Sequence, residues 1–352
     1  MAVSAFGTND SQTVSIWSKR TMREGIRSTR LFRKFLGNDD RSIIQRYVDL
    51  EKNAGDTIKI DLLMQMKSAG VSGDNRLKGN EEALVYHQDE CKIDQLRNAH
   101  AFRKMSQQRT VHDLRKDGSR NLGDWWGNIL ESYMFRRLCG DTSLDHGEAS
   151  LAPDTGHISY CGGQASEAAV VSNTEYLTLD ELDYAKEKAI MATPTMKPVR
   201  IEGDYYFVVV IHPYCVTDLR LNLGGSTVMK WVDIQQYANQ RGLKNPIFTG
   251  ALGVYNKMIL FDSDKIYSPI TNCYRNLLLG AQAGAFALGN AYDNLDQSKF
   301  GKKNFMSWYE DSDDFGNEKG IGCGGIFGIN KNRFNGTDFS VMTIPSYSAS
   351  KR

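Results

Sequence analysis

The sequence predicts a mixed α+β fold that is built from an N-terminal arm, one long extended β-hairpin, one long helix and a following α/β region. Three observations lead to this prediction: alternating apolar residues from 57 to 67, apolar residues at helical spacing from 107 to 138, and the continuous apolar run Tyr205–Ile211. A period of two is typical of a half-buried strand, and a period near 3.6 indicates an amphipathic helix. An uninterrupted apolar run suits a strand that is buried on both faces.

The composition is that of an ordinary globular protein. The 352 residues suffice for one large domain or two average ones, and the 41% hydrophobic and 24% charged residues exclude disordered, collagen-like and disulfide-scaffold classes. A net charge of +1 gives no global excess for binding a polyanion, so any basic surface is local. The six cysteines form no CxxC pair, and the first residues lack a signal-peptide pattern. We therefore expect reduced thiols and a soluble protein.

The N-terminal arm, residues 14–36, is basic and is expected to be helical. It carries seven Lys and Arg side chains and only one acid, Glu24. Two interpretations stay open: the arm binds an acidic partner such as a neighbouring subunit or nucleic acid, or it is a solvated helix on its own domain. The residues expected to make its contacts are Trp17, Arg20, Arg23, Arg27 and Arg30.

The hairpin is the most informative local feature. Ile58, Ile60, Leu62, Met64 and Met66 share one face of the strand over 57–67, a polar tip follows at 68–75, and a second extended run returns from 83 to about 93. Two arms of about 14 residues would reach roughly 45 Å, whereas a compact chain of this length has a radius of gyration near ~20 Å. The hairpin therefore extends beyond its own core and needs another contact, for which we single out Lys67, Val71, Asn75, Arg76, Lys78, Glu81 and Glu82.

The long helix is expected over 107–138, with Gly140 as its end and Gly118 and Gly123 as candidate bends. Trp125 and Trp126 are adjacent, so the sequence predicts that only one of them faces the core. The other, which we take to be Trp125, is expected at a second contact surface.

The rest of the chain is expected to combine one irregular insertion with α/β elements. Residues 141–176 have no periodicity and are predicted as an insertion at a subdomain boundary. Thr178 and Glu181 form a capping box that begins a helix to about Met191, with Leu179, Leu182, Ala189 and Ile190 inward. The last expected elements are a helix over 226–241, two strands within 247–261, a helix over 276–288, and a hairpin of 326–334 and 338–344 around Asn335-Gly336.

No enzyme motif withstands examination. Gly320, Gly322 and Gly325 match G-x-G-x-x-G, but a strand-like run follows them where a helix is required, so we expect a glycine-rich turn. The stretch 311–316 resembles the start of a calcium loop but lacks later ligands, and a solvated acidic loop is expected. His212 and Cys215 could form a nucleophilic pair, although packed residues at a sheet edge account for them better. We assign no catalytic, cofactor-binding or metal-ligating residue.

Several short stretches, spread along most of the chain, resemble stretches that occur in the same order in one protein family. They are FGTND at 6–10, LEKNAGD at 50–56, GVSGDN at 70–75, GNEE at 79–82, KMSQQR at 104–109 and DWW at 124–126. With the order arm, hairpin, long helix and α/β region, the sequence resembles the major capsid protein of tailed bacteriophages, of the Hong Kong 97-type fold, and within it the coliphage N-four-like branch.

The resemblance implies a fold, a division of the chain and a set of partners. The implied parts are an arm at 1–45, an extended hairpin loop with its base at 46–104, a peripheral domain with a spine helix at 105–200 that includes the insertion 141–176, an axial domain at about 201–320, and C-terminal strands at 321–352 that return to the peripheral domain. The implied function is self-assembly, as hexamers and pentamers, into the icosahedral shell around double-stranded DNA. The resemblance also implies a location in the virion capsid, and in the host cytoplasm during assembly. Implied partners are copies of itself, a scaffolding protein, a portal protein, a decoration protein and the packaged DNA, without a membrane, a cofactor or a catalytic role.

Two alternatives from the residues stay open at this point. One is an α/β enzyme with a site near His212 and Cys215. The other is a nucleic-acid-binding protein that acts through the basic arm.

Overall fold

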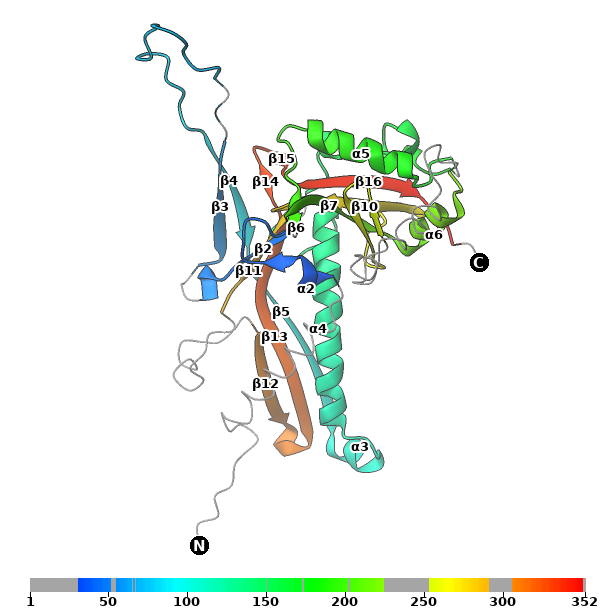
Figure 1. The fold of residues 1–352 in the computed structure, drawn as a ribbon. Helices are drawn as coiled ribbons and strands as arrows, with labels where there is room; N and C mark the ends of the chain where they lie inside the picture. The colour runs from blue at the N-terminus through cyan, green and yellow to red at the C-terminus, as the bar shows by residue number, and fades with distance from the viewer. Residues whose placement is uncertain are drawn as a thin grey trace.

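The computed structural model describes residues 31–350 except 52–54, 65, 67, 150, 173, 202, 225–252 and 291–305. Within this part of the chain, two sheets are joined through one long helix, and a β-hairpin extends away from the body (Figure 1). Residues 14–30 of the arm expected over 14–36, the expected helix at 226–241 and residues 247–252 of the expected strands lie outside the described residues. The end of the arm contains a short helix, Phe32–Phe35.

The extended hairpin, residues 57–92, pairs β3 (Thr57–Leu63) with β4 (Tyr86–Lys92). The predicted alternation is confirmed at its base, because Ile58 is buried while Ile60 and Leu62 are half-buried. The strand ends at Leu63, four residues earlier than expected, and one further hydrogen bond from Met64 N to Val85 O (2.9 Å) closes the ladder. The described residues beyond this bond, 66 and 68–84, form an open loop without strand pairing.

The first sheet lies beside the long helix. It has the strand order β1-β2-β11-β13-β12, with β5 also paired to β13. The elements are α2 (Phe32–Phe35), β1 (Leu36–Gly37), β2 (Ile44–Tyr47), η1 (Asp49–Glu51), β5 (Asp94–Arg103), α3 (Lys104–Arg109), α4 (Leu114–Leu138), β11 (Gly284–Leu288), β12 (Met306–Asp313), η6 (Asp314–Gly316) and β13 (Glu318–Lys331).

The predicted long helix is divided, but not at its glycines. It breaks at residues 110–113 between α3 and α4, where the Asp113 side chain caps α4 by accepting from the backbone N–H groups of Arg115 and Lys116. Gly118 lies within α4 and does not break it. Glycine suits this position because a Cβ there would come within 2.7 Å of the Ile321 side chain on β13. Glycine thus lets helix and sheet approach closely, and α4 ends as predicted beside Gly140, whose φ is +69°.

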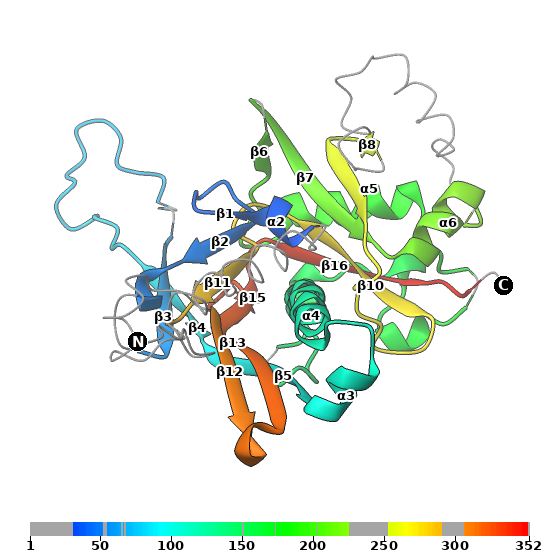
Figure 2. The same ribbon diagram turned by 90° about the horizontal axis from the view of Figure 1, so that it is seen from below.

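The second sheet has the order β16-β10-β7-β9-β8, with β6 paired to β7. Its elements are α5 (Leu179–Met191), β6 (Val199–Ile201), β7 (Asp204–Ile211), α6 (Pro213–Leu221), β8 (Gly253–Tyr255), β9 (Met258–Asp262), β10 (Cys273–Leu279) and β16 (Val341–Tyr347). Figure 2 shows α5 and α6 along this sheet, away from the extended hairpin. Pro213 follows β7 directly and occupies the first turn of α6, where its missing N–H is tolerated.

Strand β7 shows why the run Tyr205–Ile211 is apolar throughout. Val208 and Val210 belong to the core that contains Trp126 and α4, whereas Val209 and Ile211 belong to the core under α5 and α6. The predicted central buried strand is thus confirmed. The predicted start of α5 is confirmed, since Thr178 Oγ1 accepts from Glu181 N. The reciprocal half of the capping box is not formed, because Glu181 Oε1 accepts from Gly162 N instead (2.9 Å), and Ile190 is exposed rather than inward.

Two predictions in the last third of the chain are wrong. The expected helix over 276–288 is the two strands β10 and β11, both buried on both faces, so that the period of two is hidden in the sequence. The expected glycine turn at 320–325 lies inside β13, between β5 and β12. The Asn335-Gly336 turn is confirmed, with positive φ at both residues, but its strands β14 (Arg333–Phe334) and β15 (Thr337–Asp338) are short.

The insertion 141–176 is irregular, as expected, and its only helical turns in the described residues are η2 (Thr155–His157), η3 (Cys161–Gly163) and η4 (Glu167–Ala169). It connects the two sheets. Arg275 on β10 forms a two-pronged ion pair with Glu167 (2.5 and 2.8 Å) and donates to the carbonyls of Cys139 and Gly140 at the end of α4 (2.9 and 2.8 Å). The domain boundaries themselves stay a prediction.

Candidate functional site

The predicted contact residues of the extended hairpin lie mostly in its open loop and are not gathered into one site. Asn75, Arg76, Lys78 and Glu81 are exposed, Val71 and Glu82 are half-buried, and Lys67 lies outside the described residues. Several of them organise the loop itself. Ser68 N donates to Glu82 Oε2 (2.8 Å) and Gly79 N donates to Glu81 Oε2 (2.6 Å). Asn75 Nδ2 likewise donates to the Ser72 carbonyl (2.9 Å).

Sequence reasoning missed a set of exposed apolar side chains on the same hairpin. They are Leu63, Met66, Leu77, Leu84, Val85 and Tyr86, each of which exposes about half or more of its surface. Isolated surface apolar residues are ordinary, but a cluster on an overhanging hairpin indicates a contact surface. The available signal was Leu63, an apolar residue among the polar ones on the second face of β3.

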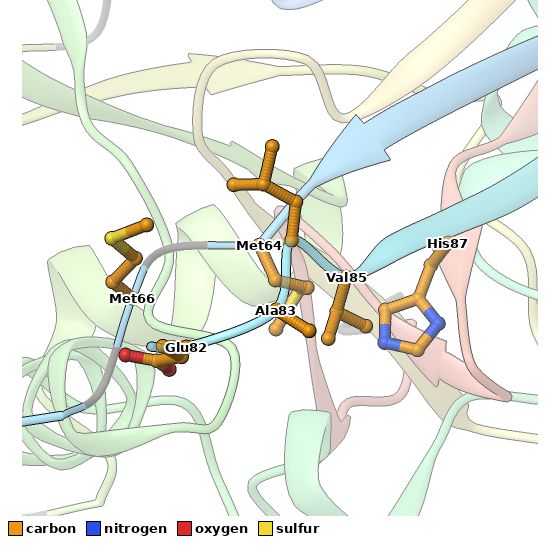
Figure 3. A pocket seen from close by; sticks show the side chains of 7 residues that line it. Met64, Met66, Glu82, Ala83, Val85 and His87 are labelled. Carbon is orange, nitrogen blue, oxygen red and sulfur yellow. The ribbon is translucent and has the colours of Figure 1, made fainter. Parts of the chain in front are cut away.

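Three of these side chains, Met66, Leu84 and Val85, line a hollow of about 180 Å³ where the two arms separate. The hollow is lined by Met64, Met66, Glu82, Ala83, Leu84, Val85 and His87. Figure 3 shows the side chains of Met64, Ala83 and Val85 close together between the arms, with His87 beside Val85. Flexible methionine side chains can adapt to an inserted apolar group, so this hollow is suited to an apolar contact.

The prediction for Trp125 needs a correction. Trp126 is fully buried, but Trp125 is half-buried and packs against the same core, with the two ring centroids 5.1 Å apart. Both rings reach one core because they are arranged edge to face, so that the Trp125 ring at the helix surface covers the buried Trp126 ring. The contact role of Trp125 beyond its own chain stays a prediction. Trp17, Arg20, Arg23, Arg27 and Arg30 of the arm lie outside the described residues.

His212 and Cys215 do not form a nucleophilic pair. The Cys215 thiol is fully buried and contacts Ser346 Oγ at 3.3 Å, and burial raises its pKa to about 11. A nucleophile would need a thiolate, which this environment opposes. The His212 ring instead stacks on Tyr274 with centroids 3.9 Å apart, and its Nδ1 caps α6 by accepting from Tyr214 N (3.3 Å).

Replacement of His212 by Asn is expected to weaken the acid sensitivity of the fold. Burial lowers the pKa of His212 to about 4, so between pH 6.5 and 4 the unfolded chain binds a proton that the folded chain does not. Stability therefore falls as the pH falls through this window. Asn retains the helix cap but does not titrate. From pH 7 to pH 5, the wild type should lose about 1 kcal/mol more free energy of unfolding than H212N, after allowance for the partial exposure of the ring.

Urea denaturation at both pH values measures this difference. His212→Phe serves as the comparison that removes both the titration and the cap, and it should be less stable than H212N at pH 7. Equal pH dependence in the wild type and H212N would show that His212 does not carry the effect.

Other chemistry is not found in the described part of the chain. All six cysteines are free and buried, as the expected reduced thiols require. No group of three or more His, Cys, Asp or Glu side chains within the described ranges could hold a metal ion. No described helix is long and apolar enough to cross a bilayer.

Comparison with known proteins gives one consistent result. The chain is similar to the capsid of Ralstonia phage GP4 at 27% identity, with a TM-score of 0.76 over 100% of this chain and 96% of that one. It is similar to the capsid subunit of cyanophage Pam1 at 21% identity, with a TM-score of 0.73 over 93% and 94% of the two chains. These structures confirm the Hong Kong 97-type fold.

The sequence comparisons agree with the structural ones. A major capsid protein of Pseudomonas phage KPP25 is 24% identical over 96% of this chain and 95% of that protein. The family model described as phage capsid protein matches residues 5–350, which is almost the whole sequence. The chain belongs to the phage capsid protein family and is a structural subunit of a phage capsid.

Proposed function

We propose that this chain is the major subunit of the icosahedral head of a tailed phage, assembled as hexamers and pentamers around double-stranded DNA. The observation that carries the proposal is the extended hairpin, whose exposed apolar residues have no partner core within the described part of their own chain. In a shell, such a hairpin lies across a neighbouring subunit. The contact buries apolar surface and supplies the stability that obligate interfaces need.

The parts of the chain take roles in this proposal. Helix α4 with β5, β12 and β13 forms the peripheral domain, and the second sheet with α5 and α6 forms the axial domain, around which a ring of subunits closes. The strands along the chain alternate between these units, since β11 and β13 join the first sheet while β10 and β16 join the second.

Further partners follow from the proposed role. A scaffolding protein guides assembly, a portal protein occupies one vertex, a decoration protein covers the outside, and packaged DNA contacts the inner face without sequence preference. A net charge of +1 supports this last point, because a container that bound many phosphates would hold its DNA too tightly to release it. A catalytic role is not part of the proposal, since Cys215 is held as a buried thiol.

Expression of the chain alone, followed by light scattering and negative-stain images of the same sample, tests the proposal. We expect closed shells or uniform rings of five and six subunits. Should the chain stay monomeric, the measurement is repeated with the cognate scaffolding protein. A monomer under both conditions contradicts the proposed function, whereas salt-sensitive DNA binding by that monomer, lost on replacing Arg20, Arg23 and Arg27 by Ala, would favour the nucleic-acid alternative.

A further inference from the structure

The end of the β12–β13 hairpin, residues 311–318, presents one aromatic side chain entirely to solvent. The segment was expected as a solvated acidic loop, and its acids are exposed at the end of β12 and in η6. Between them, Phe315 is fully exposed and has a φ of +50°. A bulky residue rarely adopts this backbone conformation, and a large apolar ring gains nothing from water. Both features favour a role in contact with another molecule.

The tip that carries Phe315 is held in place by hydrogen bonds. Asp314 N donates to Asp313 Oδ1 (2.8 Å), and Asn317 Nδ2 donates to Asp314 Oδ2 (3.1 Å). The Lys104 N–H at the start of α3 donates to the Asn317 carbonyl (3.0 Å), which ties the tip to the adjacent helix. Phe315 is thus presented on an ordered support, and ordered aromatic anchors contribute strongly to interfaces.

The hollow on the extended hairpin is the counterpart of this ring. Its lining is mainly apolar, from Met64, Met66, Ala83, Leu84 and Val85, and its volume of about 180 Å³ is of the size of one large side chain. Its floor is fixed by the bond from Met64 N to Val85 O, while Met66 and Leu84 expose more than half of their surface. One chain therefore carries an unpartnered apolar knob and an unpartnered apolar hollow.

The two features lie at different ends of the molecule, with the extended hairpin directed away from the β12–β13 tip (Figure 1). They cannot meet within one chain in this conformation. A second copy brings both together, and each subunit then donates one ring and accepts one. Contacts of this head-to-tail kind generate closed rings when the rotation from one subunit to the next closes.

We propose that Phe315 of one subunit inserts into the hollow lined by Met64, Met66, Ala83, Leu84 and Val85 of a neighbouring subunit. This proposal rests on the proposed function, because it requires copies of the chain to assemble. It adds the anchor residue and its receptor, which neither the family nor the similar structures specify for this chain.

The first test replaces Phe315 by Asn, which removes the ring and tolerates positive φ better, so that the tip still folds. We expect F315N to remain a folded subunit by circular dichroism but to need about tenfold or more protein for assembly. The matched control is Val171→Asn in the insertion 141–176, where another apolar side chain is 52% exposed, and it should assemble like the wild type. Equal assembly of F315N and the wild type would overturn the proposal.

The second test joins the two sites covalently. In the double variant F315C/M66C, oxidised glutathione should convert the two thiols into a disulfide between subunits while being reduced itself, which gives a ladder of linked subunits on a non-reducing gel. The six native cysteines are all buried and give a low background. The control F315C/V171C carries its second thiol in the insertion 141–176, where Val171 is 52% exposed, and should give no ladder.

The outcomes separate this contact from the proposed function. Normal shells from the double variant without linkage above the control show that this contact is wrong while the capsid role stands. A wild-type chain that assembles under neither condition, alone or with a scaffolding protein, contradicts both.

Discussion

Removal of residues 68–82 is expected to leave a folded subunit that forms no closed shell. The polar bonds of this loop, such as Ser68 N to Glu82 Oε2, stay within it, so the deletion costs the body of the protein little. The two arms lie side by side where they lead into the loop, because Met64 N donates to Val85 O at 2.9 Å. A two-residue Asn-Gly turn can therefore close the shortened hairpin.

Assembly is expected to fail because the loop extends beyond its own core and its loss also removes Glu82 from the rim of the hollow. The melting temperature should change by no more than a few degrees, while particles disappear from light scattering and negative-stain images. A second variant replaces residues 68–82 by a Gly/Ser segment of equal length. If that variant also fails to assemble, the side chains of the loop matter rather than its length. Normal shells from the deletion would show that the loop is not a subunit contact.

Trp126→Ala is expected to destabilise the subunit by about 3–5 kcal/mol. The ring is fully buried between α4 and β13, with its centroid 5.9 Å from that of Phe327, and the surrounding core cannot close the space it leaves. Urea denaturation of the unassembled subunit measures the loss. A change below about 1 kcal/mol would mean that the helix and the sheet are not packed as described.

Trp125→Ala is the matched control on the next residue of the same helix. Because the ring of Trp125 is only half-buried, its loss should cost the fold less than the loss of Trp126. The same variant tests the predicted contact role of Trp125. If Trp125→Ala weakens assembly by more than its loss of subunit stability accounts for, the contact role is supported. If assembly is unchanged, Trp125 is a part of the core alone.

Local chemistry made several elements readable from the sequence. The alternation from Ile58 identified the base of the hairpin because one face packs on the body while the other meets water. Thr178 marked the start of α5 because the first N–H groups of a helix need side-chain acceptors. The Asn335-Gly336 pair predicted its turn because both positions require positive φ.

Elements buried on both faces could not be read in this way. Strands β10 and β11 show no alternation, since water reaches neither face, and their small residues gave the impression of a helix. Gly320, Gly322 and Gly325 suggested a turn, but they lie in β13 opposite Ala101, Ala99 and Leu96 of β5. The partner strand that makes such a glycine useful is more than 200 residues away in sequence, and only the fold brings it near.

The sequence by itself therefore determined the family, the overhanging hairpin, the long helix and the central buried strand, because each depends on a local period or on short stretches in a fixed order. The tertiary structure alone decided which surfaces are left to bind. Leu84, Val85 and Phe315 are ordinary apolar residues in the sequence, and nothing local distinguishes them from core residues. Their exposure depends on which other segments cover them, and that is a property of the whole packed chain.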